Sequence, residues 1–278
     1  MSRYGSKIDL RRTILLGIDA QNAFGKRAQS ANLRGLRDSE DEEVRSLAHL
    51  VDVVHESGGA VVLTKDWHSE VGAELPGGRI DLRSKGEFAI YGRHAVAGTT
   101  DAELSPELEA AVQRAEARGG LARTIIPVDA YDTTGREGAR RLVEVHKNVF
   151  DVTQVQTLDG NMAANAALIG LLAGYVEAGA RHVLVAGKIA EVCVRAGAES
   201  VKKLFPTLDV IVVPGATSSL PEATAKQLGL DSKEETLEKL AAQGIGAIDL
   251  IDLIGLLPTA PSRSPPWTAR RTRDRIPR

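Results

Sequence analysis

Cysteine is nearly absent from this chain, which has one, Cys193, in 278 residues. A single cysteine excludes an intrachain disulfide framework and is typical of proteins from a reducing compartment. The sequence also lacks any apolar run near the roughly 20 residues that span a bilayer. Residues 1–12 are polar and charged, without the apolar centre of a secretory signal. We therefore expect a cytoplasmic protein with no membrane partner.

A large excess of charge of one sign is missing too, because 35 basic residues nearly balance 37 acidic ones and leave a net charge of −2. This balance gives no reason to expect a nucleic-acid partner. Hydrophobic residues, at 43%, suffice for a substantial core in one domain over residues 1–257. The proline- and arginine-rich segment 258–278 has too little apolar surface to fold, so we expect a disordered, solvated tail. A tail that touches nucleic acid or an acidic partner is the alternative.

Short apolar, β-branched runs alternate with longer helical stretches along the chain. The expected strands are 13–19, 59–65, 123–128, 142–150, 181–187 and 208–213, with 247–251 as a further candidate. The expected helices are 40–57, 161–178, 192–205 and 233–243. Continuous apolar strands are typical of a sheet covered on both faces, and the alternation indicates right-handed βαβ units. We predict an α/β fold, a three-layer sandwich with a mostly parallel, roughly six-stranded sheet.

Two further regions bear on function. Residues 69–104 contain glycines and charges with little periodicity, so we expect a long functional loop there. No phosphate-binding glycine fingerprint follows the first strand, where Gly17 precedes Ile18-Asp19-Ala20. Because the G-x-G-x-x-G spacing is missing, a dinucleotide-binding function has little support.

Reactive side chains follow the ends of several expected strands. Asp19 ends the first strand, Asp66 and His68 follow the second, Lys147 lies near the end of the fourth, and Cys193 follows the fifth. The carboxyl ends of parallel strands meet at one edge of a sheet, where ligands bind. We therefore expect these side chains to lie together.

Cys193 stands where a strand would give way to a helix, in the sequence GKIAEVCV of residues 187–194. A helix N-terminus stabilises negative charge and so favours the thiolate form of a cysteine. A carboxylate such as Asp19 can accept the thiol proton, and an ammonium such as Lys147 favours both anions. A buried, unreactive cysteine in the core is the alternative.

A second group of residues has the composition of a metal site. Asp66 and His68 form an Asp-x-His triplet, and His94 follows in the long loop. Two imidazoles and a carboxylate suit a borderline divalent ion, with positions left open for water or substrate. We expect a divalent metal ion here, zinc before iron or manganese.

Together these residues resemble the nicotinamidase branch of the isochorismatase-like cysteine hydrolases, over most of residues 13–220. The segments that carry the resemblance are DAQNAF (19–24), DWH (66–68), RHAVAGT (93–99) with AEL (102–104), Lys147 before Asp151, and GKIAEVCV (187–194). The last segment is the most specific, since this superfamily typically ends that turn with an acidic residue and Cys-Val. The segment around His94 is similar to that of the metal-containing nicotinamidases.

The resemblance implies a role for each of these residues. Cys193 would be the nucleophile, Asp19 the general base and acid, and Lys147 the cation that stabilises the thiolate. The resemblance further implies a cis peptide bond between Lys188 and Ile189. The N–H groups of Ile189 and Cys193 would form the oxyanion hole.

The resemblance also implies the metal ligands and the walls of the pocket. Asp66, His68 and His94 would hold the metal. Glu87, seven residues before His94, is a candidate fourth ligand, with a solvated loop carboxylate as the alternative. The pocket residues are Phe24 and Tyr91, which match aromatic walls around a pyridine ring, and Trp67, which is either a further wall or a packing residue beneath the loop.

Two positions depart from the family and leave the substrate open. Val192 stands where many nicotinamidases carry an aromatic residue or histidine, and Gln154 where several carry a tyrosine. We predict a nicotinamidase-like cysteine amidohydrolase, which forms nicotinate and ammonia from nicotinamide through a thioester acyl-enzyme, and expect a homo-oligomer. The alternatives are another small amide, ureide or carbamoyl substrate for the same three residues, and a non-catalytic binding protein of the same fold.

Overall fold

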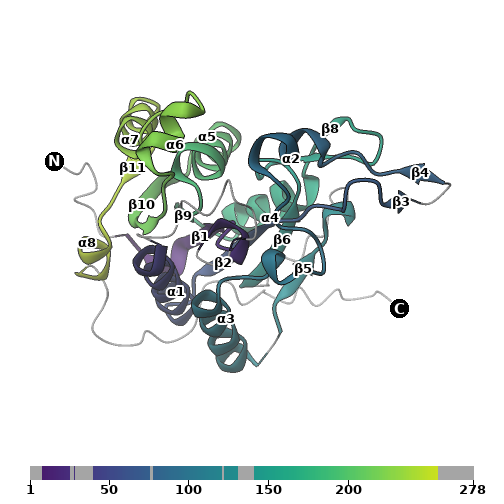
Figure 1. The fold of residues 1–278 in the computed structure, drawn as a ribbon. Coiled ribbons are helices and arrows are strands. Elements are labelled where there is room, and N and C mark those ends of the chain that lie inside the picture. Colours follow the sequence, from purple (N-terminus) through teal and green to yellow (C-terminus); the bar gives the residue numbers. More distant parts are fainter. Residues whose placement is uncertain are drawn as a thin grey trace, which may run out of the picture.

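The computed structural model describes residues 8–25, 28, 40–75, 78–120, 122–130 and 141–255. At its centre is a sheet in the order β11-β10-β9-β1-β2-β6-β5, in which every neighbouring pair is parallel (Figure 1). The strands are β1 (Thr13–Ile18), β2 (Ala60–Asp66), β5 (Thr124–Ile126), β6 (Leu142–Lys147), β9 (His182–Gly187), β10 (Asp209–Thr217) and β11 (Gly246–Ala247). The tail 258–278, for which we expected disorder, lies outside the described residues.

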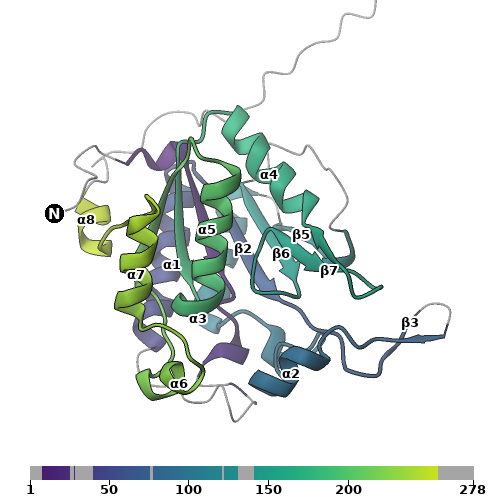
Figure 2. The same cartoon turned by 90° about the horizontal axis from the view of Figure 1, so that it is seen from above.

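Helices cover both faces of this sheet and complete a three-layer sandwich (Figures 1 and 2). One face carries α1 (Glu40–Glu56) and α3 (Pro106–Gly119), and the other carries α4 (Ala166–Glu177), α5 (Arg195–Leu204) and α7 (Lys233–Ala242). Alternate residues of β1 serve the two cores, since Ile14 and Leu16 pack with α4 and α5 while Leu15 packs with α1 and α3. The predicted α/β fold is confirmed. Within the described residues, no helix is both long enough and apolar enough to cross a membrane.

The expected strands occur close to their predicted positions, and the candidate 247–251 forms as the two-residue β11, so the sheet has seven strands instead of about six. β6 ends at Lys147, three residues before its predicted end. The reason is Asn148, whose amide donates to Gln156 O and whose Oδ1 accepts from Gln156 N–H, both at 2.8 Å. This pairing turns the chain away from the sheet and leaves Lys147 at its edge.

The segment 69–104 is more structured than the long loop that we expected. It contains a small hairpin, β3 (Glu74–Leu75) and β4 (Arg79–Ile80), and a helix, α2 (Lys85–Tyr91). The hairpin projects from the body of the protein, and α2 lies closer to the central sheet than the hairpin does (Figures 1 and 2). Because α2 has no buried side chain, no apolar stripe marks it in the sequence.

Other helices also differ from the sequence prediction. We did not expect α3, α6 (Glu222–Gln227) or α8 (Leu250–Gly255). α4 begins at Ala166 rather than 161 because Asn165 caps it, accepting a hydrogen bond from Leu168 N–H at 3.1 Å. The residues before this cap form an antiparallel hairpin, β7 (Gln154–Gln156) with β8 (Met162–Ala164). α5 begins at Arg195 rather than 192, after a π-helical turn over Ala190–Val194.

Four neighbouring strands, β9, β1, β2 and β6, end at the same edge of the sheet. β2 and β9 lie on opposite sides of β1, so the strand order reverses there. At such a switch point a crevice opens beyond the strand ends. Gly187 at the end of β9 has a φ of +121°, and a Cβ atom there would lie 2.0 Å from Ile18 O. Only glycine therefore lets the chain turn from β9 so close to β1.

Candidate active site

Lys147 lies at the centre of the residues that the sequence analysis selected. Its Nζ is 2.6 Å from Asp19 Oδ2, 3.7 Å from Asp66 Oδ1 and 4.0 Å from Cys193 Sγ. Asp66 and Lys147 are the last residues of β2 and β6. Asp19 follows β1, and Cys193 follows β9. All four side chains are buried, so the predicted grouping at one edge of the sheet is present.

Asp19 is held through both its backbone and its side chain. Its N–H donates to Thr64 O at 3.1 Å, and Thr64 Oγ1 donates to Asp19 Oδ1 at 2.8 Å. Its φ of +48°, uncommon for a residue with a side chain, marks the point where the chain leaves β1. Burial raises the pKa of Asp19, although the Lys147 ammonium opposes this effect. Asp19 is therefore a stronger proton acceptor than an exposed carboxylate.

Cys193 lies in the π-helical turn directly before α5, which agrees with its expected place at the start of a helix. Its protonation state differs from the thiolate that we expected. Burial raises the pKa of the thiol; Lys147 opposes this, but the carboxylates of Asp19 and Asp66 add to it. Burial therefore outweighs the nearby cation and the helix end, and favours the neutral thiol over the thiolate.

The turn that follows β9 leaves Ile189 N–H without an acceptor among the described residues. The Lys188–Ile189 peptide bond is cis, as the resemblance implied. Lys188 N–H donates to Ile18 O at 2.7 Å, and Ala190 N–H donates to Ser218 O at 2.9 Å. Between them, Ile189 N–H has no acceptor in the part of the chain that the structure describes. Ile189 N–H is one of the two donors, with Cys193 N–H, that the resemblance implied for an oxyanion hole.

Glu191, the acidic residue in the same turn, has a structural contact that the sequence did not reveal. Its buried carboxylate accepts hydrogen bonds from the Ser219 hydroxyl and, at 3.3 Å, from Leu220 N–H. These bonds tie the turn that carries Cys193 to the loop after β10.

Asp66, His68, Glu87 and His94 form a compact cluster beside Lys147. One donor atom from each of the four lies within 4.8 Å of the others. The Nε2 atoms of His68 and His94 are 2.9 and 3.3 Å from Asp66 Oδ2. Both atoms are also 3.8 Å from Glu87 Oε1. Glu87 is thus brought to the other three by α2 instead of standing free in solvent.

The Nδ1 atoms of both imidazoles contact residues outside the cluster, and these contacts orient the Nε2 atoms toward Asp66 and Glu87. His94 Nδ1 lies 2.6 Å from Gly92 O. Since a carbonyl can only accept, Nδ1 carries a hydrogen and Nε2 is the atom that would bind a metal. His68 Nδ1 lies 3.1 Å from Ser84 Oγ. Contacts of this kind fix the orientation of metal-binding histidines in other proteins.

The charge of the cluster favours a cation. Burial would lower the pKa of His94, but hydrogen bonds with Asp66 and Glu87 raise it to about 10. Burial would also raise the pKa of Asp66, but His68 and Lys147 hold it well below its usual range. Asp66 Oδ1 is buried and accepts no hydrogen bond from the described residues. Two carboxylates and two imidazoles in this arrangement fit a divalent ion such as zinc, iron or manganese.

Phe24 and Tyr91 lie next to the cluster, as the resemblance implied. Their ring centroids are 5.6 and 6.3 Å from that of His94, and both rings meet it edge-on. Burial raises the pKa of Tyr91, and the charges of Cys193 and Glu87 raise it further. Tyr91 therefore lies near Cys193 and Glu87 as well as near His94.

Two other aromatic residues near the site were missed by the sequence analysis. Phe88 meets His94 edge-on at 5.5 Å, and Phe150 meets Tyr91 edge-on at 5.7 Å. The available signals were weak, since Phe88 only adjoins Glu87 and Phe150 only follows Lys147 by three residues.

Trp67 packs against the sheet, in agreement with the second of its two interpretations. Its ring stacks on His146 at 4.1 Å with an interplanar angle of 17°, and Lys65 Nζ lies 4.8 Å from the ring centroid. The backbone N–H of Trp67 donates to Lys147 O at 2.7 Å. Trp67 therefore supports the Asp66–His68 segment from behind.

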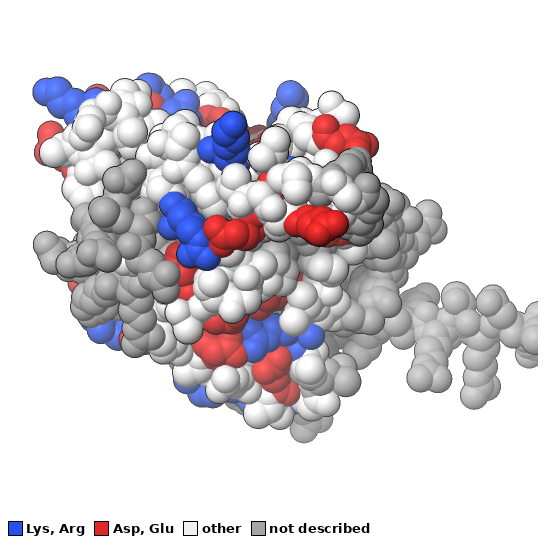
Figure 3. Space-filling model, turned by 45° about the vertical axis from the view of Figure 1, so that its right-hand side comes forward, with Lys and Arg blue, Asp and Glu red and all other residues white. Residues whose placement is uncertain are grey.

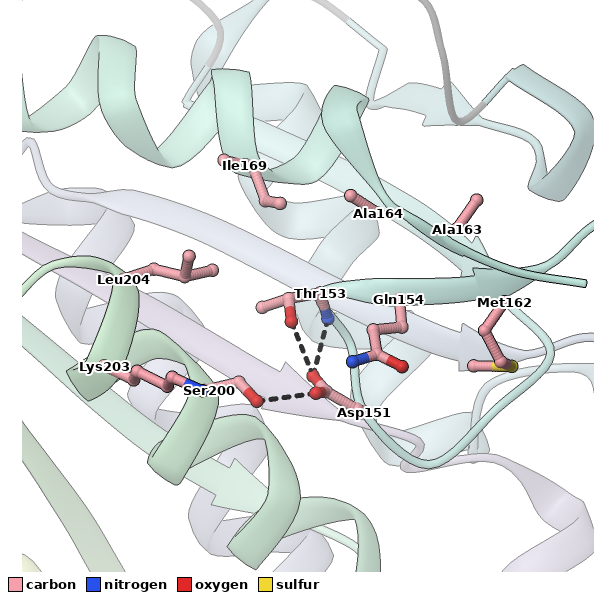
Figure 4. A pocket seen from close by; sticks show the side chains of 10 residues that line it. All are labelled: Asp151, Thr153, Gln154, Met162, Ala163, Ala164, Ile169, Ser200, Lys203 and Leu204. Atoms are coloured by element: carbon pink, nitrogen blue, oxygen red, sulfur yellow. Dashed lines mark hydrogen bonds between the residues drawn. The ribbon is translucent and has the colours of Figure 1, made fainter.

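A hollow of about 320 Å³ lies apart from these residues, between the β7–β8 hairpin, α4 and α5 (Figure 4). It is lined by Asp151, Thr153, Gln154, Met162, Ala163, Ala164, Ile169, Ser200, Lys203 and Leu204. None of the candidate catalytic or metal-binding residues lines it. Gln154, at the position where several nicotinamidases carry tyrosine, faces this hollow. On the face shown in Figure 3, Lys and Arg lie among Asp and Glu, so the described residues there form no large patch of one charge.

No protein-family model and no curated protein matches the sequence. Several solved structures are similar. A nicotinamidase/pyrazinamidase from Bacillus subtilis has 15% identity and a TM-score of 0.56, covering 84% of this chain and 98% of that one. A pyrazinamidase from Pyrococcus horikoshii in complex with zinc has 18% identity and a TM-score of 0.53, covering 86% and 99%.

An isochorismatase-family protein from Desulfovibrio vulgaris has 22% identity and a TM-score of 0.53, covering 88% of this chain and 98% of that one. At such identities the likeness concerns the fold. The chain therefore shares its fold with these nicotinamidase/pyrazinamidase, pyrazinamidase and isochorismatase-family structures.

Proposed function

We propose that the protein is a cysteine amidohydrolase that acts on a small aromatic amide, with nicotinamide as the first candidate. The observation that carries the proposal is the position of Lys147, whose Nζ lies between Asp19 Oδ2 at 2.6 Å and Cys193 Sγ at 4.0 Å, next to the cluster of His68, Glu87 and His94. A structural cysteine in a core would not need a buried carboxylate and a buried ammonium beside it, because burying both charges is costly.

In the first half of the reaction, Cys193 Sγ attacks the amide carbonyl while Asp19 accepts the thiol proton. This order suits a neutral thiol whose pKa is raised, because the proton leaves only as the C–S bond forms. Asp19 then gives that proton to the amide nitrogen, the C–N bond breaks, and ammonia leaves a thioester on Cys193.

In the second half, Asp19 accepts a proton from a water molecule, whose oxygen attacks the thioester carbonyl. The C–S bond breaks, the carboxylic acid is released, and the proton returns from Asp19 to the sulfur. Lys147 keeps its charge throughout, because Asp19, Cys193 and Asp66 raise its pKa even though burial alone would lower it. Its ammonium offsets the negative charge that moves between Asp19 and Cys193.

The carbonyl oxygen gains negative charge in both halves. We assign its stabilisation to the N–H groups of Ile189 and Cys193, and the lack of an acceptor for Ile189 N–H among the described residues supports this assignment. A donor of this kind contributes about 3–4 kcal/mol in other hydrolases.

Asp66, His68, Glu87 and His94 are the residues that would hold a divalent metal. When bound, such an ion would orient the substrate, directly or through water, by the ring nitrogen of a pyridine amide. Phe24 and Tyr91 would enclose the ring, and their contacts with His94 support this placement.

The proposal is tested by ammonia release from nicotinamide, pyrazinamide, an aliphatic amide and a simple ureide, with protein purified with its metal intact. Nicotinamide turnover that a chelator removes and zinc restores is the expected result. Turnover confined to the aliphatic amide or ureide would replace the aromatic substrate with the alternative class. No turnover of any compound, with metal bound, would overturn the amidase proposal.

A further inference from the structure

Phe150 is the one aromatic side chain in the described part of the chain that is exposed, at 36% of its surface. A ring that leaves more than a third of its surface open has area that a ligand could cover. This one stands on the loop between β6 and β7, three residues after Lys147.

The loop that carries Phe150 is fixed on both sides of it. Before Phe150, Asn148 pairs with the backbone of Gln156 through two hydrogen bonds of 2.8 Å. After it, Asp151 accepts bonds from Thr153 N–H at 2.9 Å and Thr153 Oγ1 at 2.8 Å. Ser200 Oγ on α5 donates to the same carboxylate at 2.6 Å (Figure 4). A ring on a backbone held in this way loses little conformational entropy when a ligand packs on it.

Phe150 also contacts Tyr91, an aromatic residue beside the candidate site. Its ring meets Tyr91 edge-on, with centroids 5.7 Å apart and an interplanar angle of 88°. Tyr91 in turn meets the ring of His94 edge-on. Gln154, on the adjoining strand β7, instead lines the hollow between the β7–β8 hairpin, α4 and α5 (Figure 4).

We infer that Phe150 determines specificity, as an exposed aromatic wall against which the flat ring of an aromatic amide packs beside Tyr91. The inference rests on the proposed function and deepens it, because it names a residue that would discriminate aromatic amides from aliphatic ones. An offset or edge-on aromatic contact contributes to binding beyond its buried area, whereas a linear aliphatic amide gains little from such a wall.

The test compares Phe150→Leu and Phe150→Tyr with the unaltered protein, using nicotinamide and an aliphatic amide, and measures kcat and KM for each. Leu158→Ala is the control, because Leu158 is equally exposed but lies on the turn between β7 and β8. For nicotinamide, Phe150→Leu is expected to raise KM about two- to tenfold with kcat nearly unchanged, since it removes binding common to the ground and transition states. Phe150→Tyr is expected to keep the original KM.

The KM for the aliphatic amide is expected to stay the same in every variant. Leu158→Ala is expected to leave the KM for both amides unchanged. An unchanged KM for nicotinamide in Phe150→Leu, with the unaltered protein active, overturns this inference alone. An equal rise for both amides overturns it as well, because the effect would not depend on the ring. Failure of the unaltered protein to hydrolyse either amide overturns the proposed function together with the inference.

Discussion

The ammonium of Lys147 lies 2.6 Å from the carboxylate of Asp19, and both side chains are completely shielded from solvent. Neither charge could stay in this place alone, because an isolated buried charge is strongly disfavoured. The two residues form a unit in which each keeps the other ionised next to the Cys193 thiol.

Removing one charge of this unit should therefore harm stability as well as activity. We expect Lys147→Met to lower the free energy of unfolding by about 3–5 kcal/mol, because Asp19 is left without a partner. The double variant Asp19→Asn with Lys147→Met should recover much of this loss while remaining inactive. Urea denaturation and ammonia release measure the two effects. Additive losses in the double variant would show that the two residues do not act as a pair.

The cluster of Asp66, His68, Glu87 and His94 should depend on residues that orient its ligands. We expect Ser84→Ala to weaken zinc binding by roughly 10- to 100-fold, because the hydroxyl lies 3.1 Å from His68 Nδ1. Glu87→Gln should weaken it as well if the carboxylate is a ligand. Calorimetric titration of the metal-free protein with zinc gives the affinities.

Glu70→Gln is the matched control for this experiment, because Glu70 pairs with Arg93 near the cluster but is exposed and contributes no ligand. Equal zinc affinities for Glu70→Gln and Glu87→Gln would remove Glu87 from the metal site. Unchanged affinity in Ser84→Ala would show that His68 is oriented by other contacts.

Gly187 should tolerate no side chain. A Cβ atom there would lie 2.0 Å from Ile18 O, in addition to the strain of a positive φ, so Gly187→Ala should destabilise the protein by more than about 2 kcal/mol. It should also lower kcat, because the turn that carries Ile189 and Cys193 must shift. Gly98 also has a positive φ, +77°, but has open space around its Cβ position. Thermal unfolding of Gly187→Ala that matches Gly98→Ala would contradict the predicted clash.

His55 should make the protein less stable in mild acid. Burial, with help from the charges of Arg141 and Arg118, lowers its pKa to about 4 from the 6.5 of an unfolded chain. Between these two values the unfolded chain binds a proton that the folded protein does not, so stability present above pH 6.5 is lost as the pH falls toward 4. The contribution is on the order of 1–3 kcal/mol.

The measurement is the free energy of unfolding at several pH values from 7 to 4, in the original protein and in His55→Gln. The variant should lose less stability across this range than the original protein does. The same pH dependence in His55→Gln and the original protein would disprove the assignment.

The sheet and the central residues of the site could be predicted because their signals are local in the sequence. β1, β2 and β9 are continuous apolar runs, and the parallel arrangement then brings Asp19, Asp66 and Cys193 to one edge. The approach of Glu87 to the histidines was predicted only through the resemblance. It depends on α2, a short helix with no buried face and hence no periodicity to detect.

Two properties of the site depend on the folded environment and could not be predicted. The helix start around Cys193 favours a thiolate, but burial and the nearby carboxylates raise the pKa of the thiol and favour its protonated form. The place of Phe150 depends on hydrogen bonds made by Asn148 and Asp151 with residues further along the chain. Neither the depth of burial nor these distant partners can be read from a local pattern.

The central claim is that Cys193 forms a thioester with the amide substrate. The most direct measurement is mass spectrometry of the metal-loaded protein, quenched in acid during nicotinamide turnover, beside ammonia release by Cys193→Ala. The account predicts an acyl group on the peptide that contains Cys193, and a Cys193→Ala variant that keeps its circular dichroism spectrum but has no turnover. Turnover in Cys193→Ala at the rate of the original protein would contradict the account.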